Sequence, residues 1–195
     1  MQSSVKEDRD KFIGGSDIPI IMNLSHFKTR WELLQQKAGL IEDDFKGNDY
    51  TDYGNLMEGY IRDYINREYN KRYREGKHII GDIRIHTDGE CSDSILEIKT
   101  TSVIHKRVNT YKYYLVQLLF YMYNENKEKG MLAVYERPKD FDVNFNPNRL
   151  YVYMIDIDNY KELVEEIKKE VERFREDLQK VKDNPFLTED ELWRI

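Results

Sequence analysis

The sequence is poor in cysteine, because Cys91 is the only one among 195 residues. A single thiol excludes an internal disulfide, a cysteine-ligated zinc site and an iron–sulfur cluster held within this chain. A chain without cysteine pairs is typical of a reducing compartment.

Long apolar runs and a metal-type histidine pattern are also missing. No stretch approaches the roughly 20 apolar residues of a membrane-spanning helix, and the N-terminus lacks a signal-peptide pattern. We therefore expect no membrane partner. The few histidines show no spacing typical of a metal site; they are His26, His78, His86 and His105.

Basic residues are outnumbered by acidic ones, which gives a net charge of −6. This charge weighs against a passive nucleic-acid binder, because such binding depends on neutralising phosphates. A nuclease remains compatible, since bound cations offset its carboxylates and basic residues can gather on one face. Two basic clusters, at 67–77 and 105–107, are most simply solvated surface.

Aromatic side chains are plentiful, with 15 Tyr and 8 Phe, and they supply buried area in a chain that is 35% charged. The length fits one domain. We expect a single domain over residues 1–195, with 1–11 flexible and 159–195 forming a covering helix and tail.

Apolar periodicity predicts helices and strands in a mixed order. Helices are expected over 18–22 with Ser16 as N-cap, over 29–38, 53–69, 108–123, 160–182 and 189–193, with 42–52 as a loop. Strands are expected over 79–85, 95–100, 131–137 and 150–157, the first two bracketing a turn at Asp88-Gly89. This order favours an α/β fold with a small mixed sheet flanked by helices.

The stretch from Asp88 to Thr101 carries the clearest chemical signal. Strand side chains alternate, so Glu97 and Lys99 point to one side and Leu96 and Ile98 to the other. Two carboxylates can hold Mg²⁺ or Mn²⁺, and a neighbouring lysine can orient a water and offset phosphate charge. The three-residue pattern Glu-x-Lys also occurs at 75–77, 125–127 and 166–168. Taken by itself, the pattern at 97–99 is therefore equally well explained as an ion pair on a surface strand.

A glycine-rich turn near the N-terminus offers a second signal. Gly14, Gly15 and Ser16 precede a short helix, and free N–H groups at such a turn can bind an anion. Arg9 just upstream could add a bidentate phosphate contact. A plain capped helix is the more common explanation of this pattern.

In combination these segments resemble the PD-(D/E)XK nuclease superfamily, in particular its lambda-exonuclease-like or YqaJ-type viral recombinase branch. The resemblance rests on segments that occur in the family's order: 13–18, Gly54 with Glu58, 88–93 followed by 96–99, and Gln117 with Tyr121. It implies a restriction-endonuclease-like core and a metal-dependent DNA nuclease, most simply a 5′–3′ exonuclease of phage or mobile-element recombination.

The resemblance also implies roles for individual residues. Asp88, Glu97 and the Ile98 carbonyl would bind Mg²⁺, or Mn²⁺, with Glu58 completing the site. Lys99 would position the attacking water, Gln117 would hold the catalytic strand or the DNA backbone, and Tyr121 would pack beneath it. The residues expected to receive a 5′-terminal phosphate are Arg9, Gly15 and Ser16.

Several alternatives stay open at this point. Asp82 or Asp93 could replace Asp88 at the metal, and the chain is slightly short for a ring-forming trimer. An endonuclease of the same fold, or a non-catalytic DNA-binding or assembly module, would share these motifs. The expected partners are DNA, a single-strand annealing protein and further copies of the chain, in the cytoplasm of a bacterial host cell.

Overall fold

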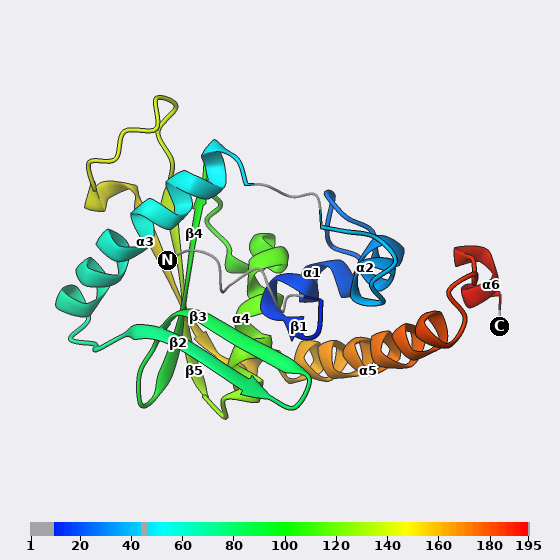
Figure 1. Cartoon of the computed structure of the whole chain (residues 1–195). Coiled ribbons are helices and arrows are strands. Elements are labelled where there is room, and N and C mark those ends of the chain that lie inside the picture. The colour runs from blue at the N-terminus through cyan, green and yellow to red at the C-terminus, as the bar shows by residue number, and fades with distance from the viewer. Residues whose placement is uncertain (1–9, 44–46, 195) are drawn as a thin grey trace.

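A mixed sheet of six strands lies at the centre of the protein (Figure 1). The computed structural model describes residues 10–43 and 47–194. The strands are β1 (Ile13–Gly14), β2 (Arg74–Ile80), β3 (Ile83–Glu90), β4 (Ser94–Thr101), β5 (Lys129–Glu136) and β6 (Leu150–Asp156). They follow the order β1-β3-β4-β5-β6, and β2 pairs with β3 outside this path.

Helices cover both faces of this sheet. They are α1 (Ile18–Ile21), α2 (Arg30–Lys37), α3 (Asp49–Glu68), α4 (Lys112–Asn124), α5 (Lys161–Asp183) and α6 (Glu189–Trp193). The parallel strands β4 and β5 are joined through α4, whereas β2–β3, β3–β4 and β5–β6 are antiparallel pairs. The predicted α/β fold with a mixed sheet flanked by helices is confirmed.

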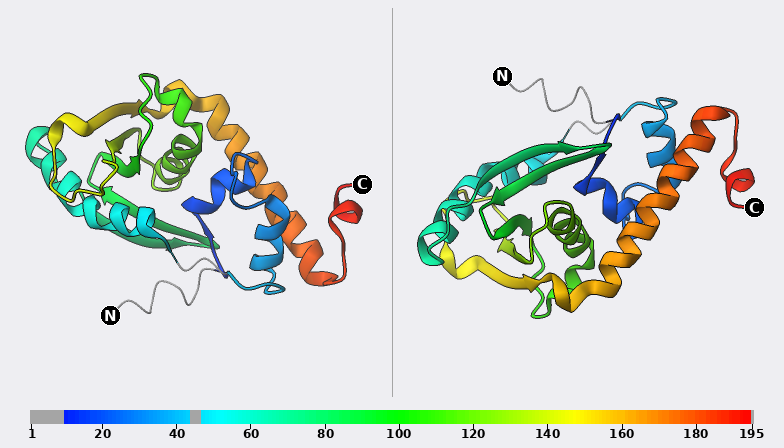
Figure 2. Two further views of the ribbon diagram at one scale, coloured as in Figure 1. Left: turned by 90° about the horizontal axis from the view of Figure 1, so that it is seen from above. Right: turned by 90° about the horizontal axis from the view of Figure 1, so that it is seen from below.

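The sheet curves around α4, which lies between the β2–β3 hairpin and β6 (Figure 2). The apolar side chains of α4 point to more than one side, so the helix has to be covered, and its central residues 115–122 are all buried. The core on this side includes Ile85, Ile95, Leu132 and Val134.

The other face of the sheet carries a smaller core under α3. Met57, Ile61 and Ile65 form the buried stripe of this helix, and they pack with Leu96 and Ile98 of β4. Successive side chains of a strand point to opposite faces of the sheet, so β4 contributes Ile95 to one core and Leu96 to the other.

The long helix α5 joins α1 and α2 to the core around α4. Its buried residues Val164, Ile167, Val171 and Phe174 recur at helical spacing. Arg30 of α2 crosses to α5, where its guanidinium reaches Glu170 at 2.7 Å and Asp177 at 3.5 Å. The helix expected over 160–182 is thus present as Lys161–Asp183.

Across the described residues, no helix combines the length and the apolar character that a bilayer crossing would require.

Several predicted boundaries are wrong for local reasons. The strand expected over 79–85 is interrupted by Gly81, whose φ of 62° makes the turn between β2 and β3. Asp88 and Gly89 consequently lie inside β3 and not on a turn. Helix α3 begins at Asp49, within the expected loop, because the Asn48 side chain accepts a hydrogen bond from the Thr51 N–H as its N-cap.

Candidate active site

The strand β4 presents Glu97 and Lys99 to the α4 side of the sheet. Leu96 and Ile98 belong to the core under α3, so the predicted alternation of side chains is confirmed. The Glu97 side chain is 1% exposed, and Lys99 Nζ lies 2.5 Å from its Oε1. Apart from this ion pair, neither Glu97 oxygen has a hydrogen-bond partner among the described residues. A carboxylate this deeply buried with a single lysine beside it can accept a further ligand.

Asp88 reaches the same place from β3. The strands β3 and β4 pair only through Gly89 and Glu90, and beyond that point they separate. The Asp88 side chain spans the gap, with its Oδ2 accepting a hydrogen bond from the Ile98 N–H at 2.6 Å. Strand separation thus places the Asp88 carboxylate beside the backbone of the residue between Glu97 and Lys99.

Glu58 approaches from α3, on the flank of its buried stripe. Its carboxylate interacts electrostatically with Asp88, Lys99 and Arg62. Arg62 follows Glu58 by one helical turn, and its guanidinium donates a hydrogen bond to the Asp88 carbonyl at 2.5 Å. Sequence reasoning missed Arg62; its spacing of four residues from Glu58 was the available signal.

Gln117 and Tyr121 approach from α4, one turn apart. Gln117 Nε2 donates to the Tyr121 hydroxyl at 3.4 Å, and both side chains are buried. Tyr121 lies against Gly15, where an added Cβ would come within 2.3 Å of its hydroxyl oxygen. Tyr121 therefore links the glycine turn to the face of the sheet that carries Glu97 and Lys99.

The glycine turn is a short 3₁₀ segment, Gly15–Asp17, and its cap differs from the prediction. Ser16 is not the N-cap; the Asp17 carboxylate accepts from the Gly14 N–H at 2.8 Å. Asp17 also pairs with Lys37 of α2 at 2.7 Å, a buried ion pair. Ser16 is exposed. Arg9, the other residue expected here, lies outside the described residues.

Burial dominates the electrostatics of the site. It raises the pKa of Glu58 to about 7 and that of Glu97 to about 8, and it also raises the pKa of Asp88. Burial acts to lower the pKa of Lys99, but the carboxylates of Glu97 and Asp88 outweigh it and raise this pKa. Among the described residues, the site thus contains three carboxylates but only two cationic side chains to balance them, those of Lys99 and Arg62.

The donor set fits a hard divalent cation. Mg²⁺ and Mn²⁺ prefer carboxylate and carbonyl oxygens, and here Asp88, Glu97 and Glu58 supply three carboxylates that act on one another electrostatically. A cation bound between them would satisfy the Glu97 oxygens and stabilise the ionised carboxylates.

The two alternative acidic residues are engaged elsewhere. Asp82 lies on the β2–β3 turn, where both of its oxygens accept from Arg175 of α5 at 2.7 Å. Asp93, on the turn before β4, pairs with Lys71 at 2.7 Å and is 60% exposed. Neither carboxylate is among the charges that act on Glu97.

The sequence of this chain matches a known protein family. The model of the YqaJ-like viral recombinase domain matches residues 6–128, which is more than half of the chain. Among curated protein sequences no match is found.

Solved structures share the fold. An alkaline exonuclease from Laribacter hongkongensis is 18% identical, with a TM-score of 0.66 over 91% of this chain and 93% of that one. A phage-related exonuclease from Haemophilus somnus 129PT is 17% identical, with a TM-score of 0.68 over 87% of this chain and 94% of that one. At such identities the likeness establishes the fold alone.

Proposed function

Because the chain belongs to the YqaJ-like viral recombinase family, we propose that it is a phage-type DNA exonuclease that hydrolyses phosphodiester bonds with Mg²⁺, or Mn²⁺, and degrades strands from 5′ to 3′. The observation that carries this proposal is the buried Glu97 carboxylate, which is ion-paired with Lys99, accepts no hydrogen bond of good geometry from the described residues and interacts with Asp88. A buried carboxylate is not expected in a strand with a purely structural role, because burying its charge destabilises the fold.

Metal binding is assigned to Asp88, Glu97, the Ile98 carbonyl and Glu58. When bound there, a divalent cation supplies charge stabilisation and a more acidic water at the scissile phosphate. Asp88 is already oriented for this task by the N–H of Ile98. Arg62 fixes the Asp88 backbone from the other side.

Lys99 holds the attacking water and offsets the charge that develops on the phosphate. Its raised pKa keeps the ammonium protonated, so it donates hydrogen bonds and does not act as a base in this state. The side chain is 25% exposed, which leaves it accessible to DNA. Gln117 and Tyr121 support the strand from beneath.

The glycine turn is assigned to the 5′-terminal phosphate, with Arg9, Gly15 and Ser16 as its ligands. Ser16 is exposed at this turn, and Gly15 contacts Tyr121, which has Glu97 and Lys99 among its neighbouring charges. A phosphate held there would lie close to the cleavage site and favour attack from the 5′ end.

We further assign residues 1–195 to a single nuclease domain. The substrate is DNA, and the site of action is the cytoplasm of a bacterial host cell. A single-strand annealing protein and further copies of the chain are its proposed partners.

An end-labelled duplex tests the proposal. The wild-type protein with Mg²⁺ should release mononucleotides, and Lys99→Ala and Glu97→Gln should each lower the rate by at least about 100-fold. The chain offers a matched control, because Glu166-Ile167-Lys168 repeats the same text on the surface of α5. Lys168→Ala and Glu166→Gln should retain full activity.

A second DNA substrate under the same conditions separates the competing functions. Cleavage of covalently closed circles, which have no ends, would identify an endonuclease. Equal release by the wild type and Lys99→Ala would contradict the role proposed for Lys99. No release at all would contradict the nuclease function and leave a non-catalytic DNA-binding module.

A further inference from the structure

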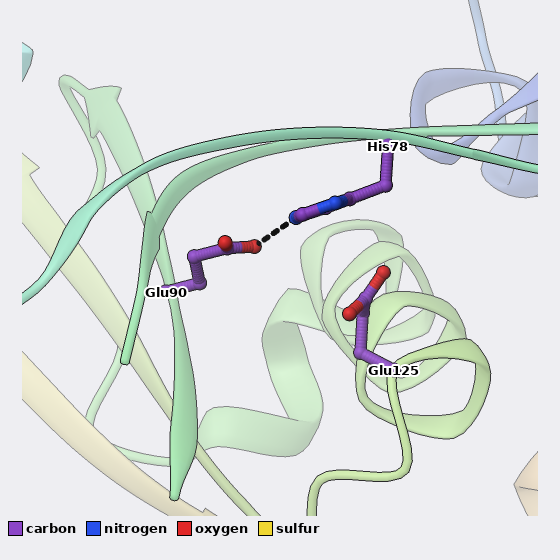
Figure 3. Close-up of side chains that lie close together, drawn as sticks. All are labelled: His78, Glu90 and Glu125. Atoms are coloured by element: carbon purple, nitrogen blue, oxygen red, sulfur yellow. Dashed lines mark hydrogen bonds and ion pairs between the residues drawn. The ribbon is translucent and has the colours of Figure 1, made fainter. Parts of the chain in front are cut away.

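A second group of ligand-type side chains lies where the β2–β3 hairpin passes the C-terminal end of α4. His78 comes from β2, Glu90 from β3, and Glu125 follows the last residue of α4, and the three side chains point toward one another (Figure 3). One ligand atom of each lies within 4.8 Å of the others, the only such group among the described residues. His78 Nε2 and Glu90 Oε2 are 2.7 Å apart.

An irregularity in the hairpin directs Glu90 toward this point. Arg74 is opposite Glu90 and Gly76 is opposite Thr87, so β3 carries one extra residue between these pairs. Such a bulge shifts the alternation of side chains. Glu90 therefore projects from the same face as Thr87, and not from the opposite face as a regular strand would require.

Gly76 provides the space that the Glu90 carboxylate occupies. A Cβ at Gly76 would lie 1.9 Å from Glu90 Oε2 and 2.7 Å from Thr87 Oγ1. The Thr87 hydroxyl therefore borders the same space. Thr87 is fully buried, and its Oγ1 has no hydrogen-bond partner in the described part of the chain. A buried hydroxyl without a partner is costly, and Thr87 can hydrogen-bond to a group placed in this space, such as a metal-bound water.

The charges around this space also favour a cation. Glu125 is the C-cap of α4, where the helix dipole already places partial negative charge. Its carboxylate makes no hydrogen bond or ion pair with the described residues. Nearby lysines are engaged elsewhere, Lys127 with the Ser92 carbonyl and Lys129 with Asp156.

We propose that His78, Glu90 and Glu125 bind a zinc ion, which joins the β2–β3 hairpin to the end of α4. Imidazole with carboxylates suits zinc, whereas Mg²⁺ takes oxygen ligands. Zinc lies about 2.0–2.2 Å from such ligands, so a small rotation of the long glutamate side chains brings all three into range. Thr87 borders the remaining position. The site is independent of the proposed nuclease chemistry.

Calorimetric titration with Zn²⁺ tests this site, using the full chain in an Asp88→Asn, Glu97→Gln background that removes the proposed catalytic ligands. We expect one equivalent of Zn²⁺ to bind, with excess Mg²⁺ unable to displace it. Adding Glu125→Gln or His78→Asn should weaken binding at least about tenfold, because losing even an outer-shell partner of a metal ligand typically costs about 10–100-fold. His26→Asn and Glu128→Gln are the matched controls and should change nothing.

Thermal melting gives an independent readout. Zn²⁺ should raise the melting temperature of the wild type and of the control variants, and should not raise that of Glu125→Gln. Glu125→Gln removes a charge at a helix C-terminus and keeps the side-chain shape, so it should fold normally. Zinc binding that is unchanged by Glu125→Gln and His78→Asn, or absent in the Asp88→Asn, Glu97→Gln background, would overturn the proposal. Neither result would affect the nuclease assay.

Discussion

At the residue scale, Gly15 is required for space. Its φ is not among the positive values that favour glycine in the described chain, yet a Cβ there would overlap the Tyr121 ring. Tyr121 is buried and cannot move aside freely. The glycine turn and α4 are thus matched to each other, and this contact brings the turn close to β4, whose Glu97 and Lys99 interact electrostatically with Tyr121.

Gly15→Ala should therefore destabilise the protein by about 1–3 kcal/mol, as overpacking of a core typically does. Urea unfolding measures the change. Gly59→Ala is the control, because a Cβ at this helical position meets no atom within 4 Å, and it should stabilise by up to about 1 kcal/mol. Equal stability of Gly15→Ala and the wild type would show that Tyr121 yields without cost.

At the element scale, the β2–β3 turn is tied to α5 through Asp82 and Arg175. The pair is bidentate, with both distances 2.7 Å, and hydrogen bonds from Arg175 lower the pKa of Asp82 below its usual 3.8. About half of the Asp82 side chain is exposed, so solvent screens the pair and its contribution is small.

Asp82→Asn should lower the free energy of unfolding by about 0.5–1 kcal/mol at neutral pH. The folded pKa is lowered, so this contribution is complete above the ordinary carboxyl pKa and is lost as pH falls through the folded value. Urea unfolding between pH 7 and 3 should show the wild type and the variant converge at the acidic end. A difference that grows with acidity would contradict this sign. Asp190→Asn, in an exposed pair, is the control.

The main helices and four strand regions were predictable from the sequence, whereas β1, most of β2 and the ends and partners of the elements were not. The stripes of α3 and α5 and the alternation around Glu97 are local patterns, and each was predicted. The turn at Gly81 was missed because the isoleucines on both sides of Gly81-Asp82, at 79, 80, 83 and 85, were assigned to one strand. His78, Glu90 and Glu125 are brought together by a bulge and a helix end, and no sequence spacing encodes that meeting.

At the scale of the whole molecule, the residues matched by the family model do not include all strands of the sheet. It covers residues 6–128, yet β5 begins at Lys129 and pairs with β4 over its full length, including Glu97 opposite Leu132 and Lys99 opposite Val134. The strand β4 is therefore central in the sheet only because later residues pair with it.

A fragment ending at residue 128 should consequently show no cooperative unfolding transition, because it lacks β5, β6 and α5 and exposes both cores. Near-ultraviolet circular dichroism and thermal melting measure this. A chain ending at Asn184 is the control. It loses α6, whose Leu192 is buried and whose Trp193 contacts Trp31 at an edge, and it should melt cooperatively at a lower temperature. A cooperative transition in the shorter fragment would contradict the expectation.

The pairing of β1 with β3 also sets an order of events in time. Ile13 pairs with Ile83, so β1 leaves the ribosome before its pairing strand β3 has been synthesised. Such a non-local, parallel contact forms slowly, since a long loop must close before the contact stabilises it. The glycine turn that follows β1 is thus synthesised early but reaches its position in the fold late. A nascent chain therefore acquires its proposed phosphate-binding site only after the β2–β3 hairpin has formed.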